Sequence, residues 1–401
     1  RFYGSEFVMT GSLYLAWRYL LYHRYKTGVL VASITLIVYL PVGLNVLVNQ
    51  SAEQLTSRAW ATPLLVGAKG SPLELVLSSL YFESDSPETI RHDQVGRIRN
   101  SNLAEPIPLY VRFHVRGHPI VGTTLDYFEF RRLRLATGRN MTVLGECVIG
   151  SSVAKTLKAQ PGASIVSSPE NVFDLAGVYP LKMHVVGVLE PSHTPDDRAI
   201  FVDVKSAWII AGLGHGHQDL SASESASGVL SRKGTKIIAN ASVVQYNEID
   251  AENLEAFHFH GDLDSYPLTA IIAVPHDAKS GVILRGRYQS SEESCQILEP
   301  IAVMDDLLET VLTVQSYVVA AVLLVGISTL ATAALVFLLS LRLRRQEIQT
   351  MVKIGGSRLC IRSLIGYEVL VVILLSIALA GLLTALTSRF GSTAIRAMLL
   401  S

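Results

Sequence analysis

The chain has 401 residues, a formal net charge of zero, 49% hydrophobic residues and only 17% charged residues. Because ordinary globular chains carry roughly a quarter charged residues, this composition argues against a purely soluble protein. The balanced charge also gives no reason to expect nucleic acid as a partner.

The N-terminal segment does not follow the pattern of a secretory signal. Such a signal begins with a short basic region and has an apolar stretch of about 7–15 residues. Here the basic residues come late and the apolar run is much longer. We expect residues 1–8, which precede the plausible native start Met9, to lie outside the native protein. Residues 9–27 are expected to form an amphipathic helix on the cytoplasmic side.

Three long segments contain no Asp, Glu, Lys or Arg: Thr27–Ala52, Thr310–Leu341 and Val369–Ser388. A bilayer core about 30 Å thick requires about 20 apolar residues in a helix, so each segment is long enough to cross it. We place the three membrane spans at residues 28–50, 310–341 and 363–388.

The charges that flank these spans predict their orientation. Basic residues precede the first span, acidic residues precede the second, and six basic residues lie in the short segment 342–362. Since basic flanks stay in the cytoplasm, the N-terminus and residues 342–362 are expected inside. Residues 51–309 and the tail 389–401 are then expected outside. The fold class is thus a membrane α-helical bundle with a large extracytoplasmic domain.

The insert between the first two spans is expected to be an α+β domain on a helical stalk. Short β-rich runs bounded by turn residues predict strands at 109–117, 147–152, 181–190, 198–204, 235–244 and 268–275. Helical patterns lie at Ser71–Tyr81, Ser152–Leu157 and Lys205–Ala211. The Gly- and Ser-rich segment 212–228 has no apolar periodicity and predicts a mobile loop.

Three stretches carry a resemblance to a known family. The loop "RRQEIQTMVKIGGSRLCIRSLIGYEVLVVIL" resembles the cytoplasmic loop of the FtsX/MacB family of ABC-transporter permeases, the type VII or mechanotransmission type. The matching positions are Arg345, Glu347, Ile348, Gly355, Gly356, Ser357, Arg358 and Glu368. The N-terminal "LAWRYLLYHRYKTG" looks like the amphipathic helix of that family. The stretches "ATGRNMTVLGECVIGSSVAKTLKAQPGASI" and "LKMHVVGVLEPSHTPDDRAIFVDVKSAW" are similar to its periplasmic domain, which ends in a late acidic turn.

The resemblance implies a multi-pass permease of the bacterial inner membrane with a periplasmic head. It implies cytoplasmic ABC ATPase subunits as partners, which hold the ATP and Mg²⁺, and a dimer with a second copy or a paralogue. Relatives also work with a periplasmic adaptor or substrate-binding protein. They transmit the motion of the ATPase to the head and so drive export or extraction of a substrate. The family usually has four spans, whereas this sequence shows three.

The chain contains no G-x-x-x-x-G-K-[ST] motif, the phosphate-binding loop of many ATPases. We therefore expect no catalytic residue and no cofactor in this chain, and a separate subunit that hydrolyses ATP. The resemblance assigns contact with that ATPase to the basic loop and its short helix. The residues are Arg344, Arg345, Glu347, Ile348, Lys353, Gly355, Gly356, Ser357 and Arg358.

No catalytic or zinc motif is present, and we predict no metal site from the sequence. Two H-x-H pairs leave binding of zinc or copper open as an alternative: His215 with His217, and His258 with His260. Residues i and i+2 of an extended segment share a face, so each pair can chelate a metal. The favoured explanation is solvated loop histidines for the first pair and ordinary strand residues for the second. A disulfide between Cys147 and Cys295 is also left open.

A second function from another class remains possible: a membrane-anchored extracytoplasmic sensor that binds a ligand. The short basic loop disfavours it, because the sequence offers no cytoplasmic output domain. Association with an ATPase separates the two functions.

Overall fold

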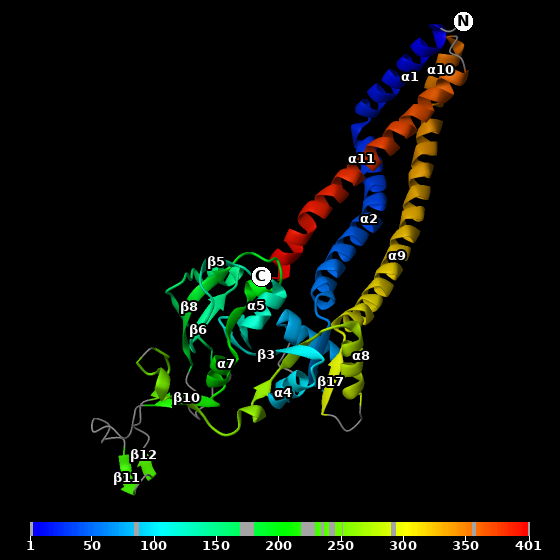
Figure 1. The fold of residues 1–401 in the computed structure, drawn as a ribbon. Coiled ribbons are helices and arrows are strands. Elements are labelled where there is room, and N and C mark those ends of the chain that lie inside the picture. Colours follow the sequence, from blue (N-terminus) through cyan, green and yellow to red (C-terminus); the bar gives the residue numbers. More distant parts are fainter. Residues whose placement is uncertain are drawn as a thin grey trace. The chain divides into compact units, whose positions relative to one another are not determined.

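The computed structural model divides the chain into two compact units, one of residues 1–55 and 306–401 and the other of residues 56–305. We call them the helical unit and the head. The structure describes residues 3–83, 88–168, 180–217, 229–233, 236–239, 245–250, 252–289, 294–354 and 358–399. Figure 1 shows the elements of both units.

The helical unit consists mainly of long helices. They are α1 (Tyr3–Tyr22), α2 (Arg24–Trp60), α9 (Pro300–Leu343), α10 (Arg345–Lys353) and α11 (Arg358–Leu399). Within the described residues, α2, α9 and the Ile361–Gly391 part of α11 are long and apolar enough to cross a membrane. With 44 residues, α9 is about 66 Å long at 1.5 Å per residue, about twice the thickness of a bilayer core.

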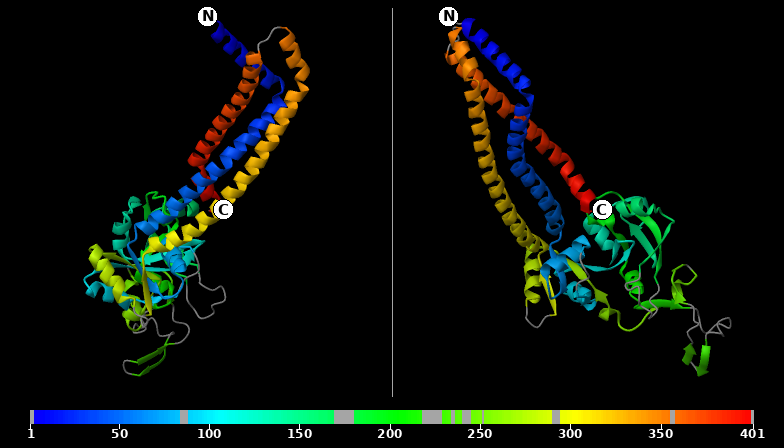
Figure 2. Two further views of the ribbon diagram at one scale, coloured as in Figure 1. Left: turned by 90° about the vertical axis from the view of Figure 1, so that its right-hand side faces the viewer. Right: turned by 180° about the vertical axis from the view of Figure 1, so that it is seen from behind.

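Helix α2 lies between α9 and α11 in the helical unit (Figure 2). The Thr35 hydroxyl of α2 donates to the Ser376 carbonyl oxygen of α11 at 3.3 Å, and both residues are buried. Gly326 marks a close approach of α9 to α2, since a Cβ there would lie 2.9 Å from Ile37 Cγ2. Small residues and hydroxyl groups at contacts are typical of helices that associate in membranes.

Helix α1 differs from the amphipathic helix expected over 9–27. It already includes Tyr3, and α2 begins at Arg24. Its exposed large side chains lie on several sides of the helix rather than on one face: Leu13, Tyr14, Leu15, Trp17, Leu21 and Tyr22. An apolar surface of this kind is covered in the native setting by lipid or by other chains.

The head is built on a mixed sheet of ten strands in the order β17-β1-β16-β3-β4-β9-β6-β8-β5, with β7 paired to β8. The strands are β1 (Leu64–Ala68), β3 (Ala104–Val115), β4 (His118–Thr123), β5 (Leu135–Gly138), β6 (Glu146–Ile149), β7 (Ser164–Val166), β8 (Lys182–Leu189), β9 (Ile200–Asp203), β16 (Ala270–Pro275) and β17 (Cys295–Leu298). Pairs β4–β9 and β6–β8 are parallel, and the others are antiparallel.

Strand β3 joins the two halves of this sheet. Its first half pairs with β16 and its second half with β4. Three smaller sheets accompany it. They contain β13 (Gln245–Tyr246), β10 (Gly214–His217) and β14 (Phe257–Phe259); β11 (Val229–Lys233) and β12 (Lys236–Ala239); and β15 (Pro267–Leu268) and β2 (Ile90–Arg91).

Short helices cover the sheet. They are α3 (Pro72–Val76), a π-helix (Leu77–Tyr81), α4 (Asp93–Asn100), α5 (Leu125–Arg131), α6 (Ser151–Leu157), α7 (Val204–Ile210) and α8 (Ala278–Arg287). Helix α7 packs on β3, β4 and β9. Gly122 of β4 permits this packing, because a Cβ at that position would lie 2.5 Å from Ala207 Cβ. Trp208, Tyr127 and Phe201 are the largest fully buried side chains of the core.

The α+β architecture and the predicted strands and helices of the head are confirmed where the structure describes them. Helices α4, α5 and α8 were not predicted. The sequence predicts a loop over 212–228, but Gly214–His217 form strand β10 between β13 and β14. Residues 218–228 lie outside the described part of the chain. Cys147 and Cys295 are both buried, and they form no disulfide in this structure.

Candidate functional site

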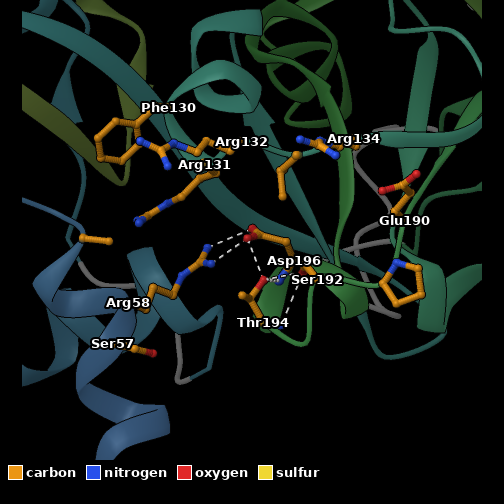
Figure 3. Close-up of a pocket in the computed structure, with 13 residues that line it drawn as sticks. Ser57, Arg58, Phe130, Arg131, Arg132, Arg134, Glu190, Ser192, Thr194 and Asp196 are labelled. Carbon is orange, nitrogen blue, oxygen red and sulfur yellow. Dashed lines mark hydrogen bonds and ion pairs between the residues drawn. The ribbon is translucent and has the colours of Figure 1, made fainter.

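A buried polar cluster in the head joins the last turn of α2 to the sheet region. The Arg58 guanidinium binds the Asp196 carboxylate through two nitrogens, at 2.6 and 2.9 Å. It also donates to the Tyr127 hydroxyl at 2.6 Å, and that hydroxyl donates to Asp196 at 2.7 Å. We call Arg58, Tyr127 and Asp196 the Arg58 cluster (Figure 3).

The Arg58 cluster is almost completely removed from solvent. The side chains of Arg58 and Asp196 are 4% and 2% exposed, and Tyr127 is fully buried. Burial by itself raises the pKa of Asp196, but the charge of Arg58 and hydrogen bonds from Arg58 and Tyr127 outweigh it and hold that pKa below its ordinary value. Burial raises the pKa of Tyr127 despite the nearby Arg58. Asp196 therefore stays ionised and Tyr127 stays protonated at neutral pH.

Local backbone structure fixes Asp196 in place. It lies in a 3₁₀ turn, Pro195–Arg198, that Thr194 caps. The Thr194 hydroxyl also donates to the Asp196 carboxylate at 2.9 Å. At Gly150, just before α6, a Cβ would lie 2.3 Å from the Asp196 carbonyl oxygen and 2.4 Å from that of Asp197. Only glycine permits this contact between α6 and the turn.

An open cavity of about 760 Å³ lies beside the Arg58 cluster (Figure 3). Its lining contains more basic than acidic side chains: Arg58, Arg131, Arg132 and Arg134 against Glu190 and Asp196. Arg131 donates to the Thr62 hydroxyl at 2.7 Å, and burial together with the charge of Arg58 lowers its pKa. The cavity is therefore lined by excess positive charge at the end of α2.

A second polar cluster lies in the helical unit, where α9 ends. Arg344 Nη1 lies 2.9 and 3.1 Å from the two carboxylate oxygens of Glu368, on α11. The Arg344 guanidinium carbon stands 3.6 Å from the centre of the Tyr19 ring of α1. We call Tyr19, Arg344 and Glu368 the Arg344 cluster. It ties α1, the α9–α10 turn and α11 together.

The residues predicted to contact an ATPase differ in exposure, and some lie outside the described part of the chain. Arg344 was assigned to a partner, but its side chain is only 12% exposed and faces Glu368. Arg345 and Lys353 of α10 are exposed, and Ile348 is half-buried. The side chains of Glu347 and Arg358, and residues Gly355, Gly356 and Ser357, lie outside the described part of the chain.

The structure brings together three of the four histidines of the two H-x-H pairs. His215, His258 and His260 offer nitrogen atoms that all lie within 4.8 Å of one another. His217 pairs through its backbone with Gln245, and its side chain lies outside the described residues.

The Arg58 cluster was missed by the sequence reasoning. Asp196 belongs to the acidic turn of the head motif, and that motif was the signal in the sequence that pointed to this residue. Arg58 follows the first apolar segment and resembles an ordinary basic flank. Its partner lies 138 residues away, so no local pattern predicts the pair.

Comparison with known proteins defines the class. The profile of the MacB-like periplasmic core domain matches residues 30–248, more than half of the chain. No curated protein matches the sequence. Solved structures similar to this chain include the extracellular domain of the noncanonic ABC-type transporter YknZ from Gram-positive bacteria, with 11% identity and a TM-score of 0.31 over 59% of this chain and 99% of that one.

The periplasmic region of MacB from Actinobacillus actinomycetemcomitans is also similar, with 10% identity and a TM-score of 0.35 over 63% of this chain and 97% of that one. A domain of a putative permease from Porphyromonas gingivalis has 12% identity and a TM-score of 0.26 over 59% and 86%. Likeness at these levels carries no argument about function.

The profile match identifies a protein with a MacB-like periplasmic core domain joined to long apolar helices. The chain belongs to the MacB/FtsX-like ABC-transporter permease family, as its resemblance predicted.

Proposed function

We propose that this chain is a permease subunit that couples ATP hydrolysis by a separate ATPase to a conformational change of its extracytoplasmic head. The change drives export or extraction of a substrate on the outer side of the membrane. Permeases of this family use a separate subunit for hydrolysis, and this chain has no phosphate-binding loop of the P-loop type.

The observation that carries this proposal is the continuity of the helices. Helix α2 includes residues of the first apolar segment and ends at Trp60 within the head, and α9 begins at Pro300 in the head and ends at Leu343. Each is one continuous helical element, although Pro41 within α2 lacks a backbone donor. Rigid secondary elements of this kind carry coupling between distant sites. The buried Arg58–Asp196 pair anchors the last turn of α2 in the head, so displacement of α2 is passed directly to the Asp196 turn.

Helix α10 is the surface that supports docking of the ATPase. It presents the exposed basic residues Arg345 and Lys353 and the exposed apolar residue Val352, and exposed Ile354 follows its last residue. Acidic side chains of an ATPase would pair with the first two. The Arg344–Glu368 pair holds the base of α10 against α11, so Arg344 acts in positioning rather than in direct contact.

The flanking charges support a cytoplasmic N-terminus and a head on the periplasmic side of a bacterial inner membrane. Three helices of the described chain are candidate spans. Many large apolar side chains of α9 are exposed, among them Leu324, Val325 and Ile327. Lipid and a second permease chain, a copy or a paralogue, are the partners that this surface fits.

Purification from the native membrane tests the proposal. An ABC ATPase is expected to co-purify with the intact chain, and Arg345→Glu is expected to abolish the association. Arg287→Glu makes the same charge change at an exposed position of α8 in the head and is expected to retain it. A sensor, the other function considered, predicts no ATPase in any of these preparations.

A further inference from the structure

Three imidazoles converge on one face of the small sheet of the head. Their ring centres lie 5.0 Å apart for His215 and His258, 4.8 Å for His215 and His260, and 4.8 Å for His258 and His260. His215 and His258 are half-buried and His260 is exposed. All three therefore approach a common point that solvent can reach.

Strand pairing explains why these side chains meet. In the antiparallel pair of β10 and β14, His215 stands directly opposite His258. Cross-strand partners share a face of the sheet, and so do residues i and i+2 of one extended segment. His260, two residues after His258, thus joins the same face.

The opposite face of this pair is apolar and packs inward. Phe257 and Phe259 are partly buried against the core of the head. They lie over the glycines of β10, since a Cβ at Gly214 would stand 2.7 Å from the Phe259 ring and one at Gly216 2.6 Å from the Phe257 ring. This packing fixes the register, and with it the side on which the histidines lie.

The nitrogen positions fit a tetrahedral metal ion. His215 Nε2 and His260 Nε2 are 3.4 Å apart. Two histidine nitrogens bound to one zinc ion at about 2.0–2.1 Å with tetrahedral angles would be about 3.3–3.4 Å apart. The candidate ligand nitrogens of the three histidines all lie within 4.8 Å of one another. Rotation of one imidazole would bring all three nitrogens to the distances that a single ion requires.

Contacts behind the ligands hold two of them in place. His258 Nδ1 lies 3.1 Å from the Ala256 carbonyl oxygen, which can only accept. This contact favours the proton on Nδ1, the tautomer in which a histidine binds a metal through Nε2. The Tyr266 hydroxyl lies 2.9 Å from the Leu213 carbonyl oxygen and 2.8 Å from that of His260. It therefore braces the segments that carry His215 and His260.

We propose that His215, His258 and His260 form a binding site for a divalent transition-metal ion, with Zn²⁺ as the ion whose tetrahedral geometry the spacing fits and Cu²⁺ as a competitor. Imidazole ligands select these metals over Mg²⁺ and Ca²⁺. Three protein ligands leave a fourth position for water or for another ligand. The ion clips β10 to the segment after β14 and so stabilises the small sheet of the head. This site is independent of ATPase docking.

Titration of the full chain in detergent, after removal of metals with a chelator, tests the site. Calorimetry with zinc chloride is expected to show one ion bound per chain with a Kd in the micromolar range or tighter. His260→Ala and His215→Ala are each expected to weaken binding at least about tenfold. Cobalt is expected to give the intense visible absorption of a four-coordinate ion with the unaltered chain and to lose it with either variant.

His276→Ala is the matched control, because His276 is exposed and lies outside the triad. It is expected to bind zinc as the unaltered chain does. His260 is exposed, so its replacement is expected to leave the metal-free unfolding temperature unchanged; if His215→Ala misfolds, His260→Ala alone decides. Absence of saturable binding below millimolar zinc, or equal binding by His260→Ala, overturns the proposal.

Discussion

Arg58, two residues before the end of α2, and Asp196, in the 3₁₀ turn after β8, form a two-point ion pair of 2.6 and 2.9 Å inside the head. Tyr127 bonds to both partners and closes the cluster. Neither charge reaches solvent, so each is stabilised by the other. Removal of one partner would leave the other charge buried and unpaired. The pair therefore holds the end of α2 in the head.

Replacement of Asp196 by Asn is expected to destabilise the head by about 3–5 kcal/mol, because it leaves the Arg58 charge buried without a counter-ion. In a domain of this size each kcal/mol lowers the unfolding temperature by about 2–4 °C. Thermal unfolding of the full chain in detergent, followed by near-ultraviolet circular dichroism, measures the loss.

The matched control is Asp93→Asn, which breaks an ion pair with Arg91 in which the two side chains are 38% and 61% exposed. An exposed pair contributes at most about 1 kcal/mol, so this variant is expected to unfold close to the unaltered chain. Equal decreases in unfolding temperature in the two variants would show that burial does not increase the stabilisation by the Arg58–Asp196 pair.

The contribution of Asp196 is expected to vanish in acid. The pKa of Asp196 in the folded head is below its ordinary value, so the folded state binds fewer protons and the stabilisation is complete above a pH of about 3.9. It is lost as the pH falls through the folded pKa. The difference in unfolding temperature between the unaltered chain and Asp196→Asn is therefore constant from neutral to mildly acidic pH and narrows in stronger acid. If the difference in unfolding temperature narrows already between neutral and mildly acidic pH, the pKa of Asp196 is not lowered in the folded head.

Gly150→Ala is expected to destabilise the head by about 1–3 kcal/mol, because the added Cβ would lie 2.3 Å from the backbone oxygen of Asp196, which cannot move like a side chain. Gly70→Ala, whose Cβ meets nothing within 4 Å, is the control and is expected to leave the unfolding temperature unchanged. Thermal unfolding compares the two variants. Equal unfolding temperatures would exclude the close packing of α6 on the Asp196 turn.

Glu368→Gln is expected to destabilise the helical unit by about 3 kcal/mol, because Arg344 loses its counter-charge in a largely buried place. The double variant Arg344→Gln with Glu368→Gln is expected to recover part of this loss, since no unpaired charge remains. Thermal stability in detergent measures the cycle, with exposed Glu309→Gln as the control. Additive effects of the two single variants would show that the pair is not coupled.

The sequence predicted the apolar helices and five of the ten strands of the main sheet, because their signals are local. Uncharged runs identify α2, α9 and α11, and alternating apolar residues identify strands such as β8. Strand β10 was misread as a loop since Gly214, His215 and Gly216 carry no strand preference. Its pairing with β14 and the aromatic rings over its glycines override that composition.

The candidate sites were predicted less well than the fold, because they depend on contacts between distant segments. The basic loop suggested that Arg344 faces a partner, yet the tertiary fold brings Glu368 of α11 within its reach. His258 and His260 are neighbours in sequence, but the approach of His215 depends on strand register that composition does not reveal. Arg58 and Asp196 are likewise brought together only by the tertiary fold.

If α2 transmits ATPase action to the Asp196 turn, amide hydrogen exchange in that turn depends on ATP. The permease with its co-purified ATPase in lipid nanodiscs is compared with and without ATP, for the peptide covering residues 191–198. A change in exchange is expected in the unaltered complex. It is expected to disappear when three glycines are inserted between Gln50 and Ser51 of α2, with ATPase association retained. An equal response in the insertion variant, or none in the unaltered complex, contradicts transmission through α2.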